Sequence, residues 1–506
     1  MATAPLPGHG LAAESGATIG LPAAALAALD ALQLELGGDV LQLGPGLDPG
    51  RLGKDYALQS PASAAPFAIA RPGDVAQVSK ILALCNAHRI PVVPQGGMTG
   101  LAGGAVPLAP ALLLSLERLR TIEEIDVEAG TMTVQAGVTL AEVQAAAEAR
   151  GLFFPLDLGG RSAQIGGNAS TNAGGTRVVR YGMMRALVLG LEAVLADGSV
   201  ISSLGKVLKN NAGYDLKQLF IGSEGTLGVI TRLVLRLQPK PASSCTALCA
   251  LPSYAEALAL LQRLRAGLGG QLAAFELMWP AFYHLATTLA GRQPPIAEGH
   301  ELYVLVEALG SDTDRDAAQF EAVIAAALEA GVVADAVIAQ SGAQARSLWE
   351  IREGSGAFRK FHSPSLPFDV SVPTSGIGAF VADCDARLRE RWPMAKILYL
   401  GHAADGNIHI SIKLDGDAGS AREMDDVVYE TVRDWKGSVS GEHGIGACKR
   451  GYLGHSRSDA EVRLMRTLKA ALDPAGILNP GKVLPPELQT ASGATNAVAA
   501  IATTGR

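Results

Sequence analysis

The clearest candidates for chemistry are two histidines in the segment LGHAADGNIHISI. His402 and His409 are seven positions apart, an odd separation that would place them on opposite faces of one continuous strand. The turn-forming sequence Asp-Gly-Asn at 405–407 predicts a hairpin instead, in which the two imidazoles converge. Glu442, framed by glycines in SGEHGIG, is the third candidate ligand. Two histidines and one carboxylate leave an open coordination position, which is typical of catalytic zinc and of other borderline divalent metals.

Two other interpretations of these residues stay open. Each histidine could be a hydrogen-bonded polar residue of the core, although three of the nine histidines fall in two glycine-framed loops. A hydrolytic zinc enzyme would use the same ligand types, but the HExxH motif is absent.

Three glycine-rich runs adjoin apolar, strand-like segments: PVVPQGGMTGLAGGAVP at 91–107, LGGRSAQIGGNASTNAGG at 158–175 and IGSEGTLGVIT at 221–231. Glycine tolerates positive φ, so backbone N–H groups of the first run can turn inward and form a nest for phosphate. The hydroxyl and amide side chains of the second run can serve ribose and a polar ring edge. A tight surface turn is the alternative for any single run. Together the runs favour a nucleotide cofactor, for which a hydrolase has no use. The GxGxxG spacing of nicotinamide-binding folds is missing.

Composition narrows the class of protein. A chain of 506 residues, 48% hydrophobic, is expected to form two or more globular domains. A net charge of −7 without basic runs excludes nucleic acid and an anionic membrane surface as partners. No apolar stretch reaches the about twenty residues that span a bilayer. The N-terminus carries neither a secretory nor a mitochondrial signal pattern, so we expect a cytoplasmic protein. The five cysteines are expected to be reduced and mostly buried.

The order of patterns along the chain predicts its organisation. An N-terminal helical segment at 1–60 precedes an α/β block at 61–241, which contains an amphipathic helix over 72–88. Strand, helix, two strands, helix and strand follow one another between 246 and 339, the order of a split βαβ unit. We therefore expect a second domain at 242–437. Residues 438–486 are expected to return to the first domain, and 487–506 to be disordered.

Four motifs resemble those of a known family: PQGGMTGLAGGAVP, PLDLGGRSAQIGGNASTNAGG, GSEGTLGVIT, and GHAADGNIH with SGEHGIG. They are similar to the FAD-linked oxidoreductases of the vanillyl-alcohol oxidase and p-cresol methylhydroxylase superfamily. Within it, the chain resembles the D-2-hydroxyacid dehydrogenase branch over residues 67–485. The resemblance implies an α+β fold, with a two-subdomain PCMH-type FAD-binding domain and a ferredoxin-like substrate cap. It also implies oxidation of a D-2-hydroxy acid to the 2-oxo acid.

The resemblance assigns cofactor roles within the same motifs. The first run would bind the FAD pyrophosphate, the second would line the isoalloxazine and adenosine, and the third would complete the domain. Family members with covalent flavin usually carry a histidine in the first loop; none stands there, so we expect non-covalent FAD. The implied FAD-binding residues are Gly96, Gly97, Met98, Thr99, Gly100, Leu101, Asp157, Gly160, Ile165, Gly167, Asn168, Thr171, Asn172, Gly174, Gly175, Glu224, Gly228, Ile230 and Asn479.

Catalytic roles are implied in the same way. His402, His409 and Glu442 match the ligands of a divalent metal, for which zinc is expected, and the metal would lower the pKa of the substrate hydroxyl. His443 matches the general base, which takes the hydroxyl proton as hydride moves to flavin N5. Arg352 in WEIREGSG matches the arginine that pairs with the substrate carboxylate.

Two departures from the family pattern bear on the substrate. Hydroxyglutarate-specific members carry a lysine where Pro367 stands, and a threonine where Gly356 stands. Both changes remove partners for a distal carboxylate, which favours a D-lactate-like substrate over D-2-hydroxyglutarate. Ala404 replaces a glycine of the turn and leaves both histidines in place.

The resemblance leaves the partners open. Electrons would pass to an electron-transfer flavoprotein, a quinone or an iron–sulfur subunit, the last as in a glycolate-oxidase-type complex. A homodimer is compatible with this sequence. A non-redox flavin transferase of the same fold is the further alternative, although its histidine-rich motif is missing.

Overall fold

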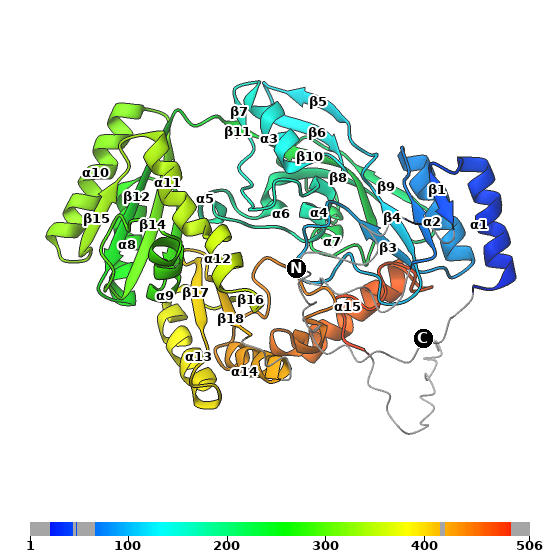
Figure 1. Ribbon diagram of the computed structural model, residues 1–506. Coiled ribbons are helices and arrows are strands. Elements are labelled where there is room, and N and C mark those ends of the chain that lie inside the picture. Colours follow the sequence, from blue (N-terminus) through cyan, green and yellow to red (C-terminus); the bar gives the residue numbers. More distant parts are fainter. Residues whose placement is uncertain (1–20, 44–46, 48–65, 415–419, 487–506) are drawn as a thin grey trace, which may run out of the picture.

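The computed structural model describes residues 21–43, 47, 66–414 and 420–486. Its described residues contain three larger sheets and a two-stranded one (Figure 1). The four- and five-stranded sheets lie together on one side of the molecule, and the seven-stranded sheet, with its helices, forms the other side. The expected disordered tail at 487–506 and the first twenty residues of the expected N-terminal segment lie outside the described residues.

The first sheet has the strand order β1-β2-β4-β3. β2 (Ala68–Ala70), β4 (Leu112–Ser115) and β3 (Val92–Gln95) are parallel, and β1 (Leu41–Leu43) is antiparallel to β2. α2 (Val75–Ala87) links β2 to β3 and begins where the Asp74 side chain accepts a hydrogen bond from the N–H of Gln77. α1 (Ala23–Leu36) packs beside α2. The short strand VVPQ leads directly into the first glycine run, so the sheet fixes where that loop begins.

The second sheet is antiparallel, with the order β5-β6-β10-β8-β9. Its apolar face is covered by α3, which starts with a capping box between Thr139 and Glu142. The second glycine run lies between β7 and α5 and contains the short helix α4. The strands are β5 (Ile122–Asp126), β6 (Thr131–Gln135), β8 (Val188–Val194), β9 (Val200–Ser203) and β10 (Val229–Arg236); β7 (Leu152–Phe153) pairs with β11 (Gln238–Pro239). The helices are α3 (Leu140–Glu148), α4 (Ile165–Ser170), α5 (Val178–Tyr181), α6 (Met184–Leu187) and α7 (Lys217–Phe220).

The third sheet, called here the cap sheet, has seven strands in the order β15-β12-β14-β13-β17-β18-β16. The expected split βαβ unit is present as β12, α8, β13, β14, α10 and β15, and the α+β class is confirmed. β17, β18 and β16 extend the unit into one larger sheet, because β13 pairs with β17. The strands are β12 (Ser243–Leu251), β13 (Leu272–Met278), β14 (Leu302–Gly310), β15 (Asp335–Ile338), β16 (Ser365–Ser371), β17 (Ile397–His402) and β18 (Asn407–Lys413).

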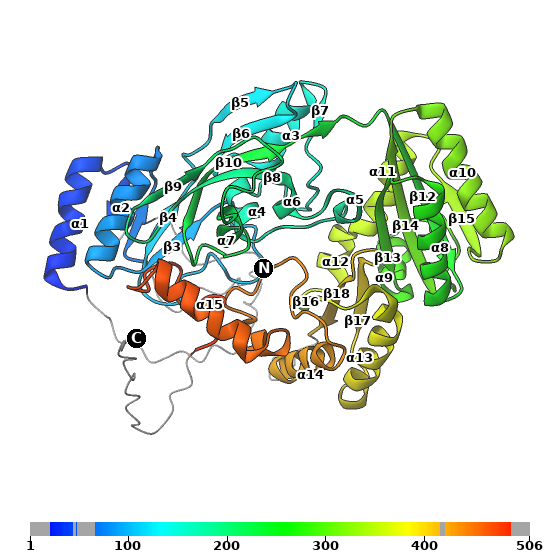
Figure 2. The ribbon, with the colours of Figure 1, turned by 180° about the vertical axis from the view of Figure 1, so that it is seen from behind.

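Helices cover both faces of the cap sheet (Figure 2). One apolar cluster includes Leu260, Phe320 and Phe380 from three helices, together with strand residues. The other face packs under α9, the π-helix η2, α11 and α12. The bounds are α8 (Tyr254–Gly267), α9 (Pro280–His284), η2 (Leu285–Leu289), α10 (Thr313–Glu329), α11 (Gly342–Glu353), α12 (Ser355–Phe361), η3 (Thr374–Gly376), α13 (Ile377–Arg391) and α14 (Ala421–Asp434).

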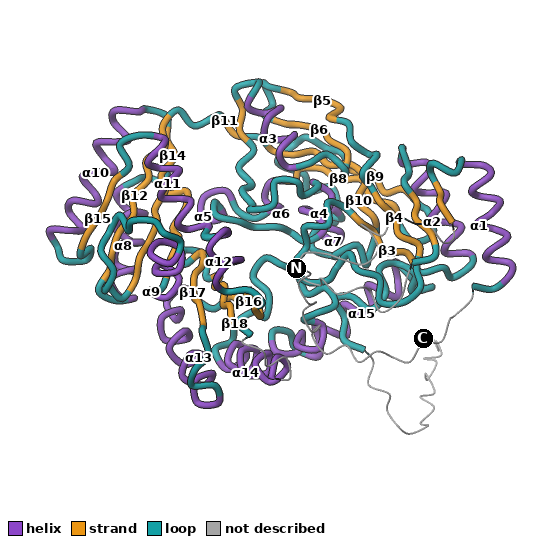
Figure 3. Tube along the Cα trace, in the orientation of Figure 1, coloured by secondary structure: helices purple, strands orange, loops and turns teal. Residues whose placement is uncertain are grey.

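The last described segment runs back to the first sheet. After η5 (Arg450–His455) and α15 (Asp459–Leu472), the N–H of Asn479 donates to the carbonyl of Val92 in β3 at 2.8 Å. Loops fill the space between the cap sheet and the other two sheets (Figure 3). The glycine runs and the SGEHGIG loop are among these connections. The domain boundaries drawn from the sequence stay a prediction.

Candidate active site

A hairpin of the cap sheet, whose strands β17 and β18 lie between β13 and β16, brings the two predicted histidines together. β17 ends at His402 and β18 begins at Asn407, so the chain turns at the Asp-Gly-Asn sequence. Both imidazoles lie on one face of the hairpin, with their Nε2 atoms 3.3 Å apart. Glu442 Oε1 lies 3.6 Å from Nε2 of His402 and 3.7 Å from Nε2 of His409. Three potential ligand atoms from two distant segments therefore meet at one point.

The spacing of these three atoms fits a divalent ion. Nitrogen ligands about 2.0–2.1 Å from a tetrahedral zinc lie about 3.3–3.4 Å from one another. His402 and His409 satisfy this with their Nε2 atoms. The donor set of two imidazoles and one carboxylate also suits zinc and its borderline neighbours.

The two histidines differ in charge because their neighbours differ. Burial disfavours a charged His402, but the carboxylates of Glu276 and Glu442 outweigh it and raise the His402 pKa to about 10. Burial and the cation of His402 lower the pKa of His409 to about 3. Burial would raise the pKa of Glu442, but the histidines around it lower that pKa to about 2. His402 is thus the more basic of the two imidazoles, and a metal at its Nε2 would have to displace a proton.

Glu442 is also the point where the second glycine run meets the cap. The N–H of Gly175 donates to Glu442 Oε2 at 2.5 Å. At Gly174, a Cβ atom would lie 2.7 Å from the same oxygen. The Glu442 carboxylate therefore occupies the space of a side chain at Gly174, whereas a Cβ at Gly175 would lie 2.1 Å from the carbonyl oxygen of Asp157. The region predicted to bind flavin therefore lies against the candidate metal ligands.

Asp369, which the sequence analysis did not single out, holds the SGEHGIG loop. Its Oδ2 accepts from the N–H groups of Gly441 at 3.1 Å, Glu442 at 3.0 Å and His443 at 2.8 Å. Asn407 Nδ2 donates to the other oxygen at 2.7 Å. Burial would raise the pKa of Asp369, but the cations and backbone donors around it keep that pKa well below its usual range. The loop thus wraps an anion with its backbone, as in a nest.

His443 is placed beside the metal ligands by this arrangement. Its ring stacks on that of His409, with centroids 5.5 Å apart and planes at 16°. Its Nδ1 lies 3.8 Å from Asp369 Oδ2. Asp369, His409 and His443 also form a compact group of potential ligands. Because the Asp369 oxygens already accept from several donors, we interpret Asp369 as a support for the loop rather than as a ligand.

Arg352 lies in the last turn of α11 and is buried against Glu276 of β13. Its Nε and Nη2 both lie 2.7 Å from Glu276 Oε2. The other oxygen of Glu276 accepts from His402 Nδ1 at 2.7 Å. Glu276 was missed by the sequence analysis, although a single glutamate inside the apolar strand LAAFELM was a signal. Arg352 thus reaches the candidate site, but two of its nitrogens already have a partner.

The first two glycine runs lie against each other. A Cβ at Gly97 would come within 2.6 Å of the Ser162 carbonyl oxygen, so only glycine fits. Met98 has a φ of 56°, and Asn172 a φ of 50°, in the left-handed region. Among the described residues, three buried side-chain atoms in this area have no hydrogen-bond partner: Gln164 Oε1, Asn168 Nδ2 and Asn479 Oδ1. Unpaired buried polar groups fit a polar ligand such as FAD.

Some residues predicted to contact FAD also have structural partners, and their contact with FAD stays a prediction. Glu224 accepts from the N–H groups of Ile445 and Gly446 at 2.7 and 2.8 Å, and so ties the third glycine run to the SGEHGIG loop. Asp157 forms an ion pair with Arg177 at 3.1 Å. Core residues and close packing account for three others: Ile165 and Ile230 are buried in an apolar cluster, and a Cβ at Gly228 would meet Phe220.

The other predicted FAD residues lie in the loops and in α4. Thr171 caps the end of α4, where its hydroxyl donates to the carbonyl of Gly167 at 3.1 Å. Asn172 accepts from the N–H of Arg185 at 2.9 Å. A Cβ at Gly160 would approach Thr99, so the tips of the first two runs touch. The turn that begins the first run carries Gly96, Gly97, Met98, Thr99, Gly100 and Leu101.

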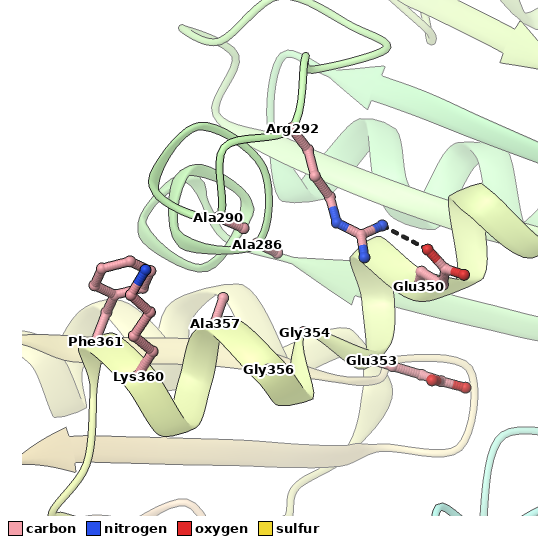
Figure 4. Close-up of a pocket in the computed structure, with 10 residues that line it drawn as sticks. All are labelled: Ala286, Ala290, Arg292, Glu350, Glu353, Gly354, Gly356, Ala357, Lys360 and Phe361. Carbon is pink, nitrogen blue, oxygen red and sulfur yellow. Dashed lines mark hydrogen bonds and ion pairs between the residues drawn. The ribbon is translucent and has the colours of Figure 1, made fainter.

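A pocket of about 270 Å³ lies between η2 and α12 in the cap (Figure 4). Gly356, one of the departures from the family pattern, is part of its lining. Two cations line it as well: Lys360 and Arg292, the latter in an ion pair with Glu350 at 2.7 Å. The remaining lining residues are Ala286, Ala290, Glu353, Gly354, Ala357 and Phe361.

Comparison with known proteins decides the family. Residues 66–203 match the model described as FAD binding domain, and residues 240–483 match that of the FAD linked oxidases, C-terminal domain. The chain belongs to the FAD-linked oxidases. It is 40% identical to the mitochondrial D-2-hydroxyglutarate dehydrogenase of Arabidopsis thaliana, over 82% of this chain and 75% of that protein. A putative mitochondrial D-lactate dehydrogenase of Schizosaccharomyces pombe is also 40% identical, over 81% and 80%.

Further relatives agree on the family. The D-2-hydroxyglutarate dehydrogenase of Xanthomonas citri is 41% identical, over 83% of this FAD-linked oxidase and 89% of the relative. The fold is that of p-cresol methylhydroxylase, with a TM-score of 0.75, 17% identity and 92% of this chain and 98% of that chain covered. An alkyldihydroxyacetonephosphate synthase has a TM-score of 0.64 at 17% identity, covering 82% and 77%. The family and the PCMH-type fold expected from the motifs are confirmed.

Two expectations change. The cytoplasmic location is wrong by this comparison, because the relatives from Arabidopsis, S. pombe, rice and cattle are named mitochondrial. The preference for a D-lactate-like substrate finds no support, since the names of the relatives favour D-2-hydroxyglutarate. No helix in the described part of this FAD-linked oxidase combines the length and apolar character needed to cross a bilayer.

Proposed function

We propose that this FAD-linked oxidase oxidises a D-2-hydroxy acid to the 2-oxo acid. The observation that carries the proposal is the contact between the N–H of Gly175 and Glu442. It places the histidine and carboxylate cluster directly against the glycine run of the FAD-binding region. A D-2-hydroxy acid is also the substrate class named for the relatives.

FAD is held without a covalent bond in this proposal. The loop from Gly96 to Leu101 contains no histidine that could attach to the flavin. Gln164, Asn168 and Asn479 supply buried polar atoms for the bound cofactor. When bound, FAD supplies a hydride acceptor at N5.

His402, His409 and Glu442 hold a divalent metal in this proposal. Their ligand atoms are spaced for an ion about 2 Å from each. When bound, such a metal polarises the hydroxyl of the substrate and lowers its pKa. Glu276 accepts from His402 Nδ1, and Asp369 accepts from the backbone N–H of Glu442. Both contacts support the assignment, because carboxylates commonly hold the ligands of metal sites in place.

His443 is the proposed general base. It stacks on His409 and therefore lies within reach of a hydroxyl at the metal position. Arg352 is proposed to bind the substrate carboxylate. Its Nε and Nη2 are engaged by Glu276, so Nη1 is the nitrogen that would contact the substrate. Arg352 would then hold the substrate while Glu276 holds Arg352.

The proposal names the class of substrate. Which D-2-hydroxy acid is preferred has to be decided by assaying D-lactate and D-2-hydroxyglutarate side by side. Pro367 and Gly356 favour an uncharged side chain, as in D-lactate. The names of the relatives, and the cation Lys360 in the pocket that Gly356 lines, favour D-2-hydroxyglutarate. Electrons are proposed to leave the flavin for a quinone or a protein acceptor, such as an electron-transfer flavoprotein or an iron–sulfur subunit. A homodimer stays a prediction.

Metal removal tests the proposal. The purified protein is assayed with D-lactate, D-2-hydroxyglutarate and an artificial electron acceptor, before and after dialysis against a chelator. Activity is expected to disappear with the metal and to return with Zn²⁺ or another divalent ion, while FAD stays bound. Full activity of the metal-free protein would contradict the metal assignment. A lack of activity in the isolated protein would instead point to a required partner subunit.

A further inference from the structure

The carboxylate of Glu276 connects Arg352 to His402 within the cap sheet. Oε2 accepts from Arg352 Nε at 2.7 Å, and Nη2 of the same guanidinium lies 2.7 Å away. Oε1 accepts from His402 Nδ1, also at 2.7 Å. The side chain is fully buried, so water does not compete for either oxygen. One carboxylate is therefore shared between the proposed substrate arginine and a proposed metal ligand.

The contact with His402 decides which of its nitrogens is available to a metal. An ionised carboxylate accepts hydrogen bonds and cannot donate them, so His402 Nδ1 must carry the hydrogen. Nε2 is then the nitrogen that faces Nε2 of His409 at 3.3 Å and Glu442 at 3.6 Å. Without Glu276, the ring could rotate or take the other tautomer. Its lone pair would then leave the position that the other ligands face.

Register explains why Glu276 can do this. Glu276 is the direct partner of His402 in the pairing of β13 with β17, so both side chains leave the same face of the sheet. Arg352 reaches this face from α11, which packs over it. A buried carboxylate is costly without a counter-charge, and the Arg352 guanidinium supplies one. The planar guanidinium also limits rotation of the carboxylate, and so of the hydrogen bond to His402.

We propose that Glu276 is a positioning residue for the metal site, and that it makes metal affinity depend on Arg352. The inference rests on the metal site of the proposed function. Residues that hold the second nitrogen of a ligating histidine typically change metal affinity by about 10–100-fold. The link is reciprocal, because a bound metal that stabilises the His402 tautomer also stabilises the Glu276 position that holds Arg352.

The affinity of the FAD-bound protein for Zn²⁺ tests the proposal. Glu276→Gln keeps the shape of the side chain but makes one end a donor that must face Arg352 or the Nδ1–H of His402. We expect the Kd for Zn²⁺, measured by competition with a chromogenic chelator, to rise by about 10–100-fold. With Co²⁺ in place of Zn²⁺, the visible absorption bands are expected to shift, because the ligand geometry changes.

Glu307→Gln is the matched control. Glu307 is a buried carboxylate on the neighbouring strand β14, and it pairs with Arg177 at 3.0 Å. Glu307→Gln removes a buried carboxylate from the same sheet and breaks its ion pair with an arginine, but Glu307 has no contact with His402. The Zn²⁺ Kd and the Co²⁺ bands of Glu307→Gln should match those of the wild-type protein. A wild-type Kd and spectrum in Glu276→Gln would overturn the proposal.

A double variant protects the test against misfolding. Glu276→Gln leaves a buried Arg352 without its anion, which can destabilise the cap. Glu276→Gln combined with Arg352→Met removes both charges together, an exchange that buried ion pairs often tolerate. The double variant is expected to bind FAD and to bind Zn²⁺ as weakly as Glu276→Gln alone. Arg352→Met alone should weaken Zn²⁺ binding, but not further in the Glu276→Gln background. Equal effects of Arg352→Met in both backgrounds would overturn the dependence on Arg352.

The outcomes separate the proposal from the proposed function. If the wild-type protein with bound FAD does not bind Zn²⁺, Co²⁺ or Mn²⁺, the metal site itself is wrong and the role of Glu276 falls with it. If the wild-type protein binds metal and Glu276→Gln binds it equally well, only the role of Glu276 is wrong.

Discussion

Replacing Asp369 by asparagine should loosen the SGEHGIG loop without unfolding the protein. Asp369 Oδ2 accepts from the N–H groups of Gly441, Glu442 and His443 at 2.8–3.1 Å. In Asp369→Asn the amide oxygen can keep this place, and the new NH₂ group then faces Asn407. The three N–H groups would keep an acceptor but lose its negative charge.

The size of the effect follows from the difference between charged and neutral acceptors. A hydrogen bond to a charged group stabilises by about 1.5–3 kcal/mol, and one between neutral groups by about 0.5–1.5 kcal/mol. A loss of about 1 kcal/mol at each of three bonds gives about 3 kcal/mol for local opening of the loop. Since 1.4 kcal/mol is a factor of ten, backbone exchange in the loop should accelerate by about 150-fold.

Hydrogen–deuterium exchange read by mass spectrometry measures this directly. Peptides covering 440–446 are expected to exchange about 150-fold faster in Asp369→Asn, and peptides of the first sheet at the wild-type rate. Asp473→Asn is the matched control, since buried Asp473 accepts from the N–H groups of Ile477 and Leu478 at 3.0 and 2.8 Å. It should accelerate exchange around 477–478 and not in the loop. Unchanged exchange at 440–446 in Asp369→Asn would refute the support that we assign to Asp369.

Three further changes have defined outcomes. Gly97→Ala should lower FAD occupancy and thermal stability, because the new Cβ would lie 2.6 Å from the Ser162 carbonyl oxygen, whereas Gly159→Ala has open space and should retain FAD in the absorbance spectrum. Lys360→Met should lower kcat/KM for D-2-hydroxyglutarate about tenfold and leave kcat/KM for D-lactate unchanged if the pocket of Figure 4 takes a distal carboxylate; a kcat/KM for D-2-hydroxyglutarate equal to that of the wild-type protein would contradict this use of the pocket. Bonds from Ser243, Asp312 and Gln271 lower the pKa of Asp316 to about 2, below the unfolded value, so its stabilisation is present above pH 4 and lost as pH falls to 2. Asp316→Asn should flatten this acid limb in urea-unfolding curves measured from pH 2 to 6.

The sequence was sufficient for features that local patterns encode. The turn residues at 405–407 predicted a hairpin that joins His402 and His409, and the structure has their Nε2 atoms 3.3 Å apart. Glycine runs predicted close backbone approaches, and a Cβ at Gly97 or Gly174 would indeed collide with a neighbour. The split βαβ order was readable because strands and helices there alternate with clear apolar periods.

Contacts that depend on strand pairing could not be predicted from the sequence. Glu276 is 126 residues from His402, and Asp369 is 74 residues from His443, and no motif links either pair. Only the pairing of β13 with β17 and of β16 with β18 brings these carboxylates to the site. Glu224 has a further contact that the motif did not indicate. Its carboxylate accepts from backbone groups of the SGEHGIG loop, and the FAD contact that the family resemblance implies for it stays a prediction.

Reduction of the bound flavin tests the central claim most directly. The protein is mixed anaerobically with D-lactate, D-2-hydroxyglutarate and their L-enantiomers, with the metal present and after chelation, and flavin absorbance near 450 nm is followed in a stopped-flow instrument. The account predicts bleaching by at least one D-acid, none by the L-acids, and loss of bleaching when the metal is removed. Bleaching by L-acids, or no bleaching by any acid with FAD and metal bound, would contradict it.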